Sequence, residues 1–178
     1  WFTIALANER TRSRAEAGFG DVLKFRGEFK AAQPRFEQAL ALAPNDPYSQ
    51  LDIAEYWHYR AMNADEATDR KAFLESARSH YVEAWKLDDS MPETYAMYGQ
   101  TFLMQGQYVT AIEMLEEAER LLPANLDIRL ILAEAYTGAG LKEKAIEAAR
   151  SVLVWSHGDD GMASRVREIL AQLDSGTE

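Results

Sequence analysis

The apolar residues of this chain recur at helical spacing over most of its length. The stretch 92–125 shows the pattern clearly, because small or apolar residues share one helix face, stop at Gly106, and then share one face again. The residues before the break are Tyr95, Tyr98, Gly99 and Phe102, and those after it are Ala111, Ile112, Leu115 and Ala118. A glycine between two helical patterns is typical of a short turn. The stretch is therefore predicted to form a helix, a turn and a second helix.

This pattern occurs four times along the chain. One position of the first helix and three positions of the second repeat every 34 residues, with a single insertion of 11 residues between the first and third occurrences. The series are Gly20, Ala54, Gly99 and Ala133; Ala32, Ala77, Ala111 and Ala145; Phe36, Tyr81, Leu115 and Ala149; and Ala39, Ala84, Ala118 and Val152. Their agreement indicates a repeat array. We expect four units, at 13–46, 47–91, 92–125 and 126–157.

The two ends of the chain lie outside these units. Residues 1–12 are interpreted as an N-terminal helical segment or the remnant of an upstream region, and residues 158–178 as a capping helix with a tail. The apolar face of the predicted cap consists of Met162, Val166, Ile169, Leu170 and Leu173. At the other end, Trp1, Phe2, Ile4 and Leu6 offer an apolar surface for self-association.

Two local features depart from the repeat. Pro34 falls inside the second helix of the first unit, so this helix is predicted to kink or to start late. The inserted residues lie around 59–72, where Asn63 followed by Glu66 resembles a capping box at a helix start. Both helices of the second unit are therefore expected to be longer than the others, with the polar added part projecting into solvent or, alternatively, forming a plain loop.

The third unit resembles a tetratricopeptide repeat throughout its sequence, PETYAMYGQTFLMQGQYVTAIEMLEEAERLLPAN. The positions that carry the resemblance are Tyr95, the pair Tyr98–Gly99, Phe102, Ala111, Leu115, Ala118 and Pro123. The resemblance covers about residues 13 to 157 and is weakest in the second and fourth units. It implies an all-α, right-handed solenoid of antiparallel helix pairs. Such repeats serve proteins with unrelated partners, so the resemblance does not identify a ligand.

Composition limits the chemistry that this chain can perform. The formal net charge is -10, which disfavours nucleic acid and favours cationic partners. The absence of Cys removes disulfides and thiolate sites and leaves the compartment open between cytoplasm and periplasm. No catalytic or nucleotide-binding motif occurs, and Glu55 with His58 forms a single E-x-x-H where a di-iron site needs two. We therefore expect no enzymatic activity, no cofactor and no metal. The apolar start of the chain is too short to insert into a membrane.

The resemblance implies that the first helix of each unit lines a concave groove. The residues selected as its peptide-binding surface are Asp21, Phe25, Leu51, Asp52, Glu55, Tyr59, Met97, Gln100, Met104 and Glu134. Carboxylates and large apolar side chains predominate, so the expected ligand is a cationic, amphipathic helix or extended peptide of another protein. Relatives that clamp the carboxylate of a chaperone use basic residues, which this chain lacks at those places. An alternative is that Leu103, Leu130 and Ile131 simply pack neighbouring helices.

The chain is thus predicted to be a non-enzymatic protein-interaction scaffold. The alternative is a repeat module of a larger enzyme or membrane-anchored protein whose active part lies upstream of Trp1.

Overall fold

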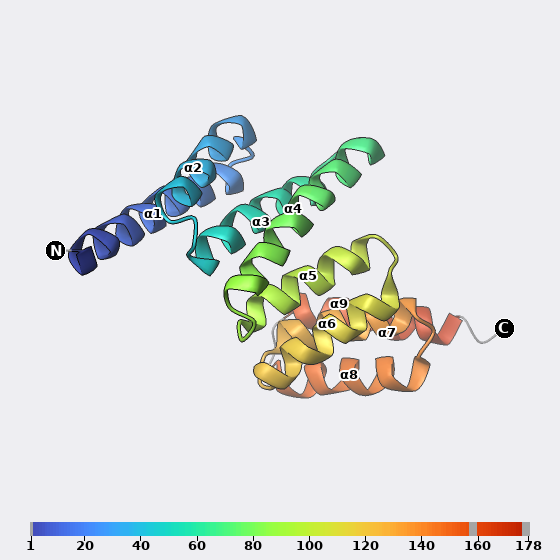
Figure 1. Cartoon of the computed structure of the whole chain (residues 1–178). Coiled ribbons are helices and arrows are strands. Elements are labelled where there is room, and N and C mark those ends of the chain that lie inside the picture. The colour runs from blue at the N-terminus through green and yellow to red at the C-terminus, as the bar shows by residue number, and fades with distance from the viewer. Residues whose placement is uncertain (1, 157–159, 176–178) are drawn as a thin grey trace. The chain divides into compact units, whose positions relative to one another are not determined.

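The protein is an assembly of α-helix pairs, as the computed structural model in Figure 1 shows. The structure describes residues 2–156 and 160–175, and their side chains over 8–156 and 161–174. Within these ranges every regular element is an α-helix, which confirms the all-α class. The chain divides into two compact units, Trp1–Ser90 (unit 1) and Met91–Glu178 (unit 2).

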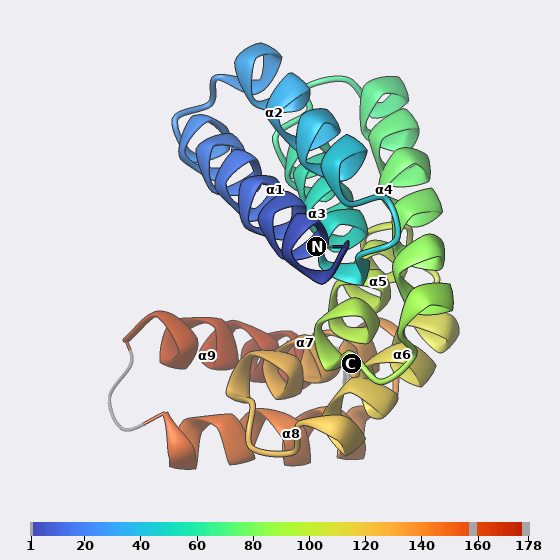
Figure 2. The same cartoon turned by 60° about the vertical axis from the view of Figure 1, so that its left-hand side comes forward.

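Unit 1 contains four helices: α1 (Phe2–Phe25), α2 (Phe29–Leu42), α3 (Pro47–Met62) and α4 (Ala67–Leu87). Helix α1 pairs with α2, α3 pairs with α4, and α3 also packs against both α1 and α2 (Figure 2). Helix α1 is continuous across residues 12 and 13, so the predicted N-terminal segment and the first helix of the array are one element. The side chains of the expected self-association surface, Trp1, Phe2, Ile4 and Leu6, lie outside the described residues.

Unit 2 contains α5 (Pro92–Met104), α6 (Tyr108–Leu121), α7 (Leu126–Gly138), α8 (Lys142–Trp155) and α9 (Asp160–Ser175). Helices α5 and α6 form one pair, α7 and α8 the next, and α9 packs on α7 and α8. Val166, Ile169 and Leu173 of α9 are buried in the core of this unit. The predicted capping helix is therefore confirmed.

Glycine permits two features of the helix pairs. The turn between α5 and α6 places Gly106 at φ 71°, a left-handed conformation that side chains disfavour. Gly99 lies where α5 crosses α6, since a Cβ atom there would stand 2.8 Å from Leu115 Cγ. Gly99 therefore allows the close approach of these two helices.

Pro34 does not delay the start of its helix. Helix α2 begins at Phe29 and continues through Pro34 to Leu42, so the predicted late start is wrong. The proline lies early in the helix and its ring is exposed, so it removes one backbone hydrogen bond without displacing the core. Burial of Phe36 and Ala39 on the following turns holds the helix in place.

The junction between α3 and α4 also differs from the prediction. Asn63 ends α3 and its side-chain amide donates to the Tyr59 carbonyl at 2.8 Å, while Glu66 precedes α4 without a capping hydrogen bond. The predicted capping box is therefore wrong, because Asn63 closes the earlier helix. Helices α3 and α4 have 16 and 21 residues, against 13 and 14 in α5 and α6, and residues 65–72 are exposed.

Candidate functional site

The ten predicted groove residues are divided between the two units. Unit 1 holds Asp21, Phe25, Leu51, Asp52, Glu55 and Tyr59, and unit 2 holds Met97, Gln100, Met104 and Glu134. Each group is described within its own unit.

In unit 1 the structure brings polar and aromatic residues of α1 and α3 together on one surface. We call this surface the α1–α3 face and define it by Asp21, Lys24 and Phe25 of α1 and by Asp52, Glu55 and Tyr59 of α3. Residues three, four or seven apart share one side of a helix, so the sequence places each triplet on a common side. The edge of the Phe25 ring meets Tyr59, with ring centroids 5.7 Å apart. Five of the six predicted residues of unit 1 therefore meet.

Lys24 lies between the acidic and the aromatic residues of this face. Its side chain is almost fully buried, and Nζ lies 2.6 Å from the Asp21 carboxylate. The same Nζ lies 4.9 Å from the centre of the Phe25 ring and 5.8 Å from that of Tyr59. Lys24 is not among the ten groove residues selected from the sequence. The spacing of Asp21 and Lys24, three residues on one helix, was the available signal.

Burial strongly perturbs the Asp52 carboxylate. Burial is the largest cause and raises the pKa of Asp52 to about 7. Repulsion from Glu55 and Asp21 adds to this effect, whereas the ammonium group of Lys24 opposes it. No other described residue makes a hydrogen bond or an ion pair with the Asp52 side chain. Near neutral pH this carboxyl group is thus distributed between its protonated and charged forms.

Leu51 does not belong to the exposed surface. It is buried, as are Ala54 and His58, and the three residues follow one another at helical spacing on α3. The assignment of Leu51 to the groove is therefore wrong, because this side of α3 is a packing side. Burial also lowers the pKa of His58 to about 4, so its imidazole is neutral at physiological pH.

The predicted residues of unit 2 are less accessible than expected. Met97, Gln100 and Met104 are partly buried, and Glu134 of α7 forms an ion pair with Arg165 of α9. The pair borders a cavity of about 510 Å³ that Leu103 and Tyr108 also line. The carboxylate of Glu134 is thus already neutralised within the unit.

The alternative interpretation of the apolar groove residues is confirmed in unit 2. Leu130 is fully buried in its core, and Leu103 and Ile131 pack against the same core. These three side chains therefore hold helices together.

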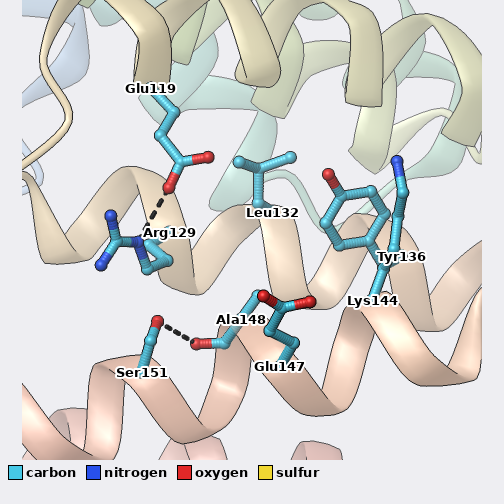
Figure 3. A pocket seen from close by; sticks show the side chains of 8 residues that line it. All are labelled: Glu119, Arg129, Leu132, Tyr136, Lys144, Glu147, Ala148 and Ser151. Carbon is cyan, nitrogen blue, oxygen red and sulfur yellow. Dashed lines mark hydrogen bonds and ion pairs between the residues drawn. The ribbon is translucent and has the colours of Figure 1, made fainter.

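A second cavity of about 410 Å³ lies among α6, α7 and α8 (Figure 3). Arg129 donates to Glu119 at 2.8 Å, as the dashed line shows, which joins α7 to α6. Tyr136 and Lys144 both donate to Glu116, at 2.7 and 3.1 Å. The hydrogen bond from the Tyr136 hydroxyl is the largest of the effects that lower the pKa of Glu116. These contacts use the two cations of the cavity to stabilise the stacking of the three helices.

Two kinds of feature are not found in the described part of the chain. Residues 8–156 and 161–174 contain no cluster of three potential metal ligands. Among the described helices, none combines the length and the apolar character needed to cross a bilayer.

Comparisons with known proteins agree with the geometry. Residues 102–173 match the family model described as tetratricopeptide repeat. A search of curated proteins finds no significant match.

Solved structures share the fold at low sequence identity. One, reported as the functional characterization of Pseudomonas aeruginosa pilF, is 16% identical, covers 96% of this chain and 79% of its own, and has a TM-score of 0.74. A thermophilic TPR protein of Thermus thermophilus is 20% identical over 89% of this chain and 99% of its own, with a TM-score of 0.61.

A third structure contains a bound peptide. It is the first TPR of Spaghetti (RPAP3) bound to the HSP90 peptide SRMEEVD, and it is 15% identical over 74% of this chain and 95% of its own, with a TM-score of 0.61. The family match and the helix pairs lead to one conclusion: residues 102–173 are a tetratricopeptide-repeat region, and the described chain as a whole has the fold of solved tetratricopeptide repeat proteins.

Proposed function

We propose that the α1–α3 face of unit 1 binds a cationic, amphipathic segment of another protein, and that the chain acts as a non-enzymatic scaffold. This fold commonly mediates protein–protein interactions, and one structural neighbour contains a bound peptide. The observation that carries the proposal is the meeting of three carboxylates with the exposed ring of Phe25 and the half-buried ring of Tyr59 on one surface of unit 1.

The aromatic pair supplies the apolar part of the site. Phe25 is 69% exposed although its ring edge contacts Tyr59. A large exposed ring held by a neighbour presents apolar area with little loss of side-chain freedom on binding. An apolar side chain of the partner packing on Phe25 would therefore gain burial without disrupting the core.

The carboxylates supply the charged part. Asp21, Asp52 and Glu55 are accompanied on this face by a single ammonium group, and that group already binds Asp21. Burial, and then repulsion from Glu55 and Asp21, raise the pKa of Asp52, and a Lys or Arg of the partner beside Asp52 would lower this pKa by stabilising the charged carboxylate. Binding would then release protons, so affinity should increase as the pH rises through about 7.

The charge of this face distinguishes it from a site for acidic peptides. The HSP90 peptide SRMEEVD in the neighbouring structure contains three acidic residues and one Arg. The carboxylates of the α1–α3 face would repel such a peptide. The two partners therefore differ in charge although the folds are alike.

An amidated peptide of Leu, Lys and Ala, designed as an amphipathic helix, tests this function by isothermal titration calorimetry. The variants Asp52→Asn and Phe25→Ala should each weaken binding roughly 10-fold, since removing one buried contact or charge pair costs about 1–2 kcal/mol. The control Asp127→Asn changes an exposed carboxylate of α7 in unit 2 and should leave the affinity unchanged.

Three further measurements make the test decisive. The peptide SRMEEVD should not bind, and the affinity for the cationic peptide should increase between pH 6 and pH 8 in the wild type, less so in Asp52→Asn. A Met104→Ala variant tests whether unit 2 contributes. Equal affinities of wild type, Asp52→Asn and Phe25→Ala, all folded by circular dichroism, would rule out this surface as the site.

A further inference from the structure

Helix α1 exposes an apolar stripe, flanked by arginines, on a side that the other helices of unit 1 leave largely uncovered. At the border of this stripe the guanidinium group of Arg35 in α2 lies 5.8 Å from the centre of the Phe19 ring. In Figure 2, α1 lies along one edge of this unit. The stripe, which we call the outer face of α1, consists of Arg12, Ala15, Phe19, Val22 and Arg26. All five residues are exposed, and the two largest apolar side chains, Phe19 and Val22, are 60% and 51% exposed. Such a stripe is unusual for a surface that meets only water.

The equivalent stripe of α3 shows what normally covers these positions. Thirty-four residues after Phe19 and Val22 stand Ile53 and Tyr56, which are buried against α2. The Tyr56 hydroxyl donates to the carbonyl of Phe29 in α2 at 3.1 Å. The side chains of the α3 stripe therefore contact the preceding helix pair, α1 and α2.

Two flanking positions of the α3 stripe make similar contacts. Ser49, equivalent to Ala15, hydrogen-bonds Ser13 of α1 with oxygen atoms 2.9 Å apart. Arg60, equivalent to Arg26, lies 5.5 Å from the ring centre of Phe29 in α2. The flanks of the α3 stripe, and not only its apolar centre, therefore contact the preceding pair.

Unit 2 repeats this arrangement. Leu132 and Ala135 of α7 are buried in a core that includes Leu115 and Ala118 of α6. Val166 and Ile169 of α9, another 34 residues on, are buried in the same core. In three helices of the array the stripe is thus covered, and in α1 it is exposed.

The charge of the outer face indicates the chemistry of its occupant. It carries Arg12 and Arg26 and no carboxylate, in a chain whose formal net charge is -10. Neither guanidinium group forms an ion pair with another described residue. An acidic helix would therefore match this surface in both charge and apolar pattern.

We propose that an acidic, amphipathic helix of a partner protein packs on the outer face of α1, in the way that α2 packs on α3. Its apolar stripe covers Phe19 and Val22, and its carboxylates lie beside Arg12 and Arg26. A second copy of this chain fits less well, because an α1–α1 contact brings like charges together. The exposed side of α9 is also unsuitable, since it presents polar residues such as Arg167 and Gln172.

A synthetic peptide with the sequence of α6, YVTAIEMLEEAERL, is a suitable probe, capped at both ends. In unit 2 this helix covers the equivalent stripe of α7, and it contains four Glu and one Arg. It should bind the full chain and shift the amide NMR signals of residues 12–26. The double variant Phe19→Asp, Val22→Asp should weaken binding roughly 10-fold or more, because two apolar contacts are lost. The control Val154→Asp alters a side chain of α8 that is 66% exposed and should bind like wild type.

Four results would overturn the proposal. The first is that the changes in amide NMR signals are confined to α7, which would mean that the peptide exchanges with the resident α6. The second is equal binding of the peptide by wild type and the double variant, and the third is equal binding of a peptide whose four Glu are replaced by Lys. The fourth is a wild-type dimer in sedimentation that the double variant abolishes. The last result would assign the outer face to a second copy. Because Phe19 and Val22 are exposed, the double variant should keep the wild-type circular dichroism spectrum.

Discussion

Units 1 and 2 share one helix-pair plan but fill it with different side chains. In unit 1 aromatic rings dominate: Phe36 and Tyr56 lie 5.2 Å apart, and the Arg60 guanidinium lies 4.1 Å from the Phe73 ring centre. In unit 2 the core consists mainly of aliphatic residues such as Leu115 and Leu132. The plan requires a small residue at each helix crossing and leaves the remaining volume open to either chemistry.

The units also differ in whether their partly buried carboxylates have a cation partner. In unit 2, Glu116, Glu119 and Glu134 each pair with a cation on another helix. In unit 1, Glu16 of α1 likewise pairs with Arg35 of α2. Asp52, however, has no such partner among the described residues, and burial raises its pKa to about 7. Paired carboxylates stabilise the stacking of helices, whereas an unpaired, half-buried one remains available for a ligand. The proposed binding site therefore lies in unit 1.

The largest expected effect concerns the aromatic core of unit 1. Tyr56→Ala should destabilise the protein by about 3–5 kcal/mol, because it removes a fully buried ring and its hydrogen bond to Phe29. Tyr56→Phe keeps the ring and removes the two hydrogen bonds of the hydroxyl, the one donated to Phe29 and the one accepted from Arg60, and should cost about 1–2 kcal/mol. Hydrogen exchange should show the loss of protection in α1–α4. Equal losses in α5–α9 would mean that the two units unfold as one.

The next effect concerns the helix crossing of unit 2. Gly99→Leu should destabilise by about 1–3 kcal/mol or more, since even a Cβ atom would stand 2.8 Å from Leu115. Gly18→Ala is the matched control, because nothing lies within 4 Å of a Cβ atom there. It should stabilise by about 0.5–1 kcal/mol through helix propensity. Thermal unfolding measures both, and an unchanged midpoint for Gly99→Leu would contradict the crossing.

A pH-dependent effect should distinguish Asp52 from the paired carboxylates. Its folded pKa is raised, so the folded state holds the proton more tightly than the unfolded state, and the wild type loses stability as the pH rises from about 4 to about 7. Asp52→Asn removes this loss and should be more stable than wild type by about 2 kcal/mol at pH 8. At pH 4 the two should be alike. Denaturant unfolding across this range measures the difference, and a constant difference would contradict the raised pKa.

The smallest effect is expected at the ion pair of unit 2. Glu134→Gln should cost no more than about 1 kcal/mol, because both partners are partly exposed and salt screens them. The cost should decrease at high salt concentration. A larger, salt-independent loss in thermal unfolding would mean that this pair is as important as the cores.

The sequence by itself determined the helix pairs, the repeat period and the cap. These features depend on local spacing, because residues three and four apart share a helix face and a small residue such as Gly99 is required wherever two helices cross. The same spacing brought Asp21 and Phe25 onto one side of α1 and Asp52 and Tyr59 onto one side of α3.

Only the tertiary structure decided which of these sides are covered. The periodicity of the sequence shows which residues share one side of a helix, but not which other helix packs on that side. Leu51 was therefore assigned to the surface although it is buried. The pairing of Glu134 with Arg165 likewise depends on two helices far apart in the sequence. The raised pKa of Asp52 and the exposed outer face of α1 have the same origin, since burial and charge are set by whichever elements pack nearby.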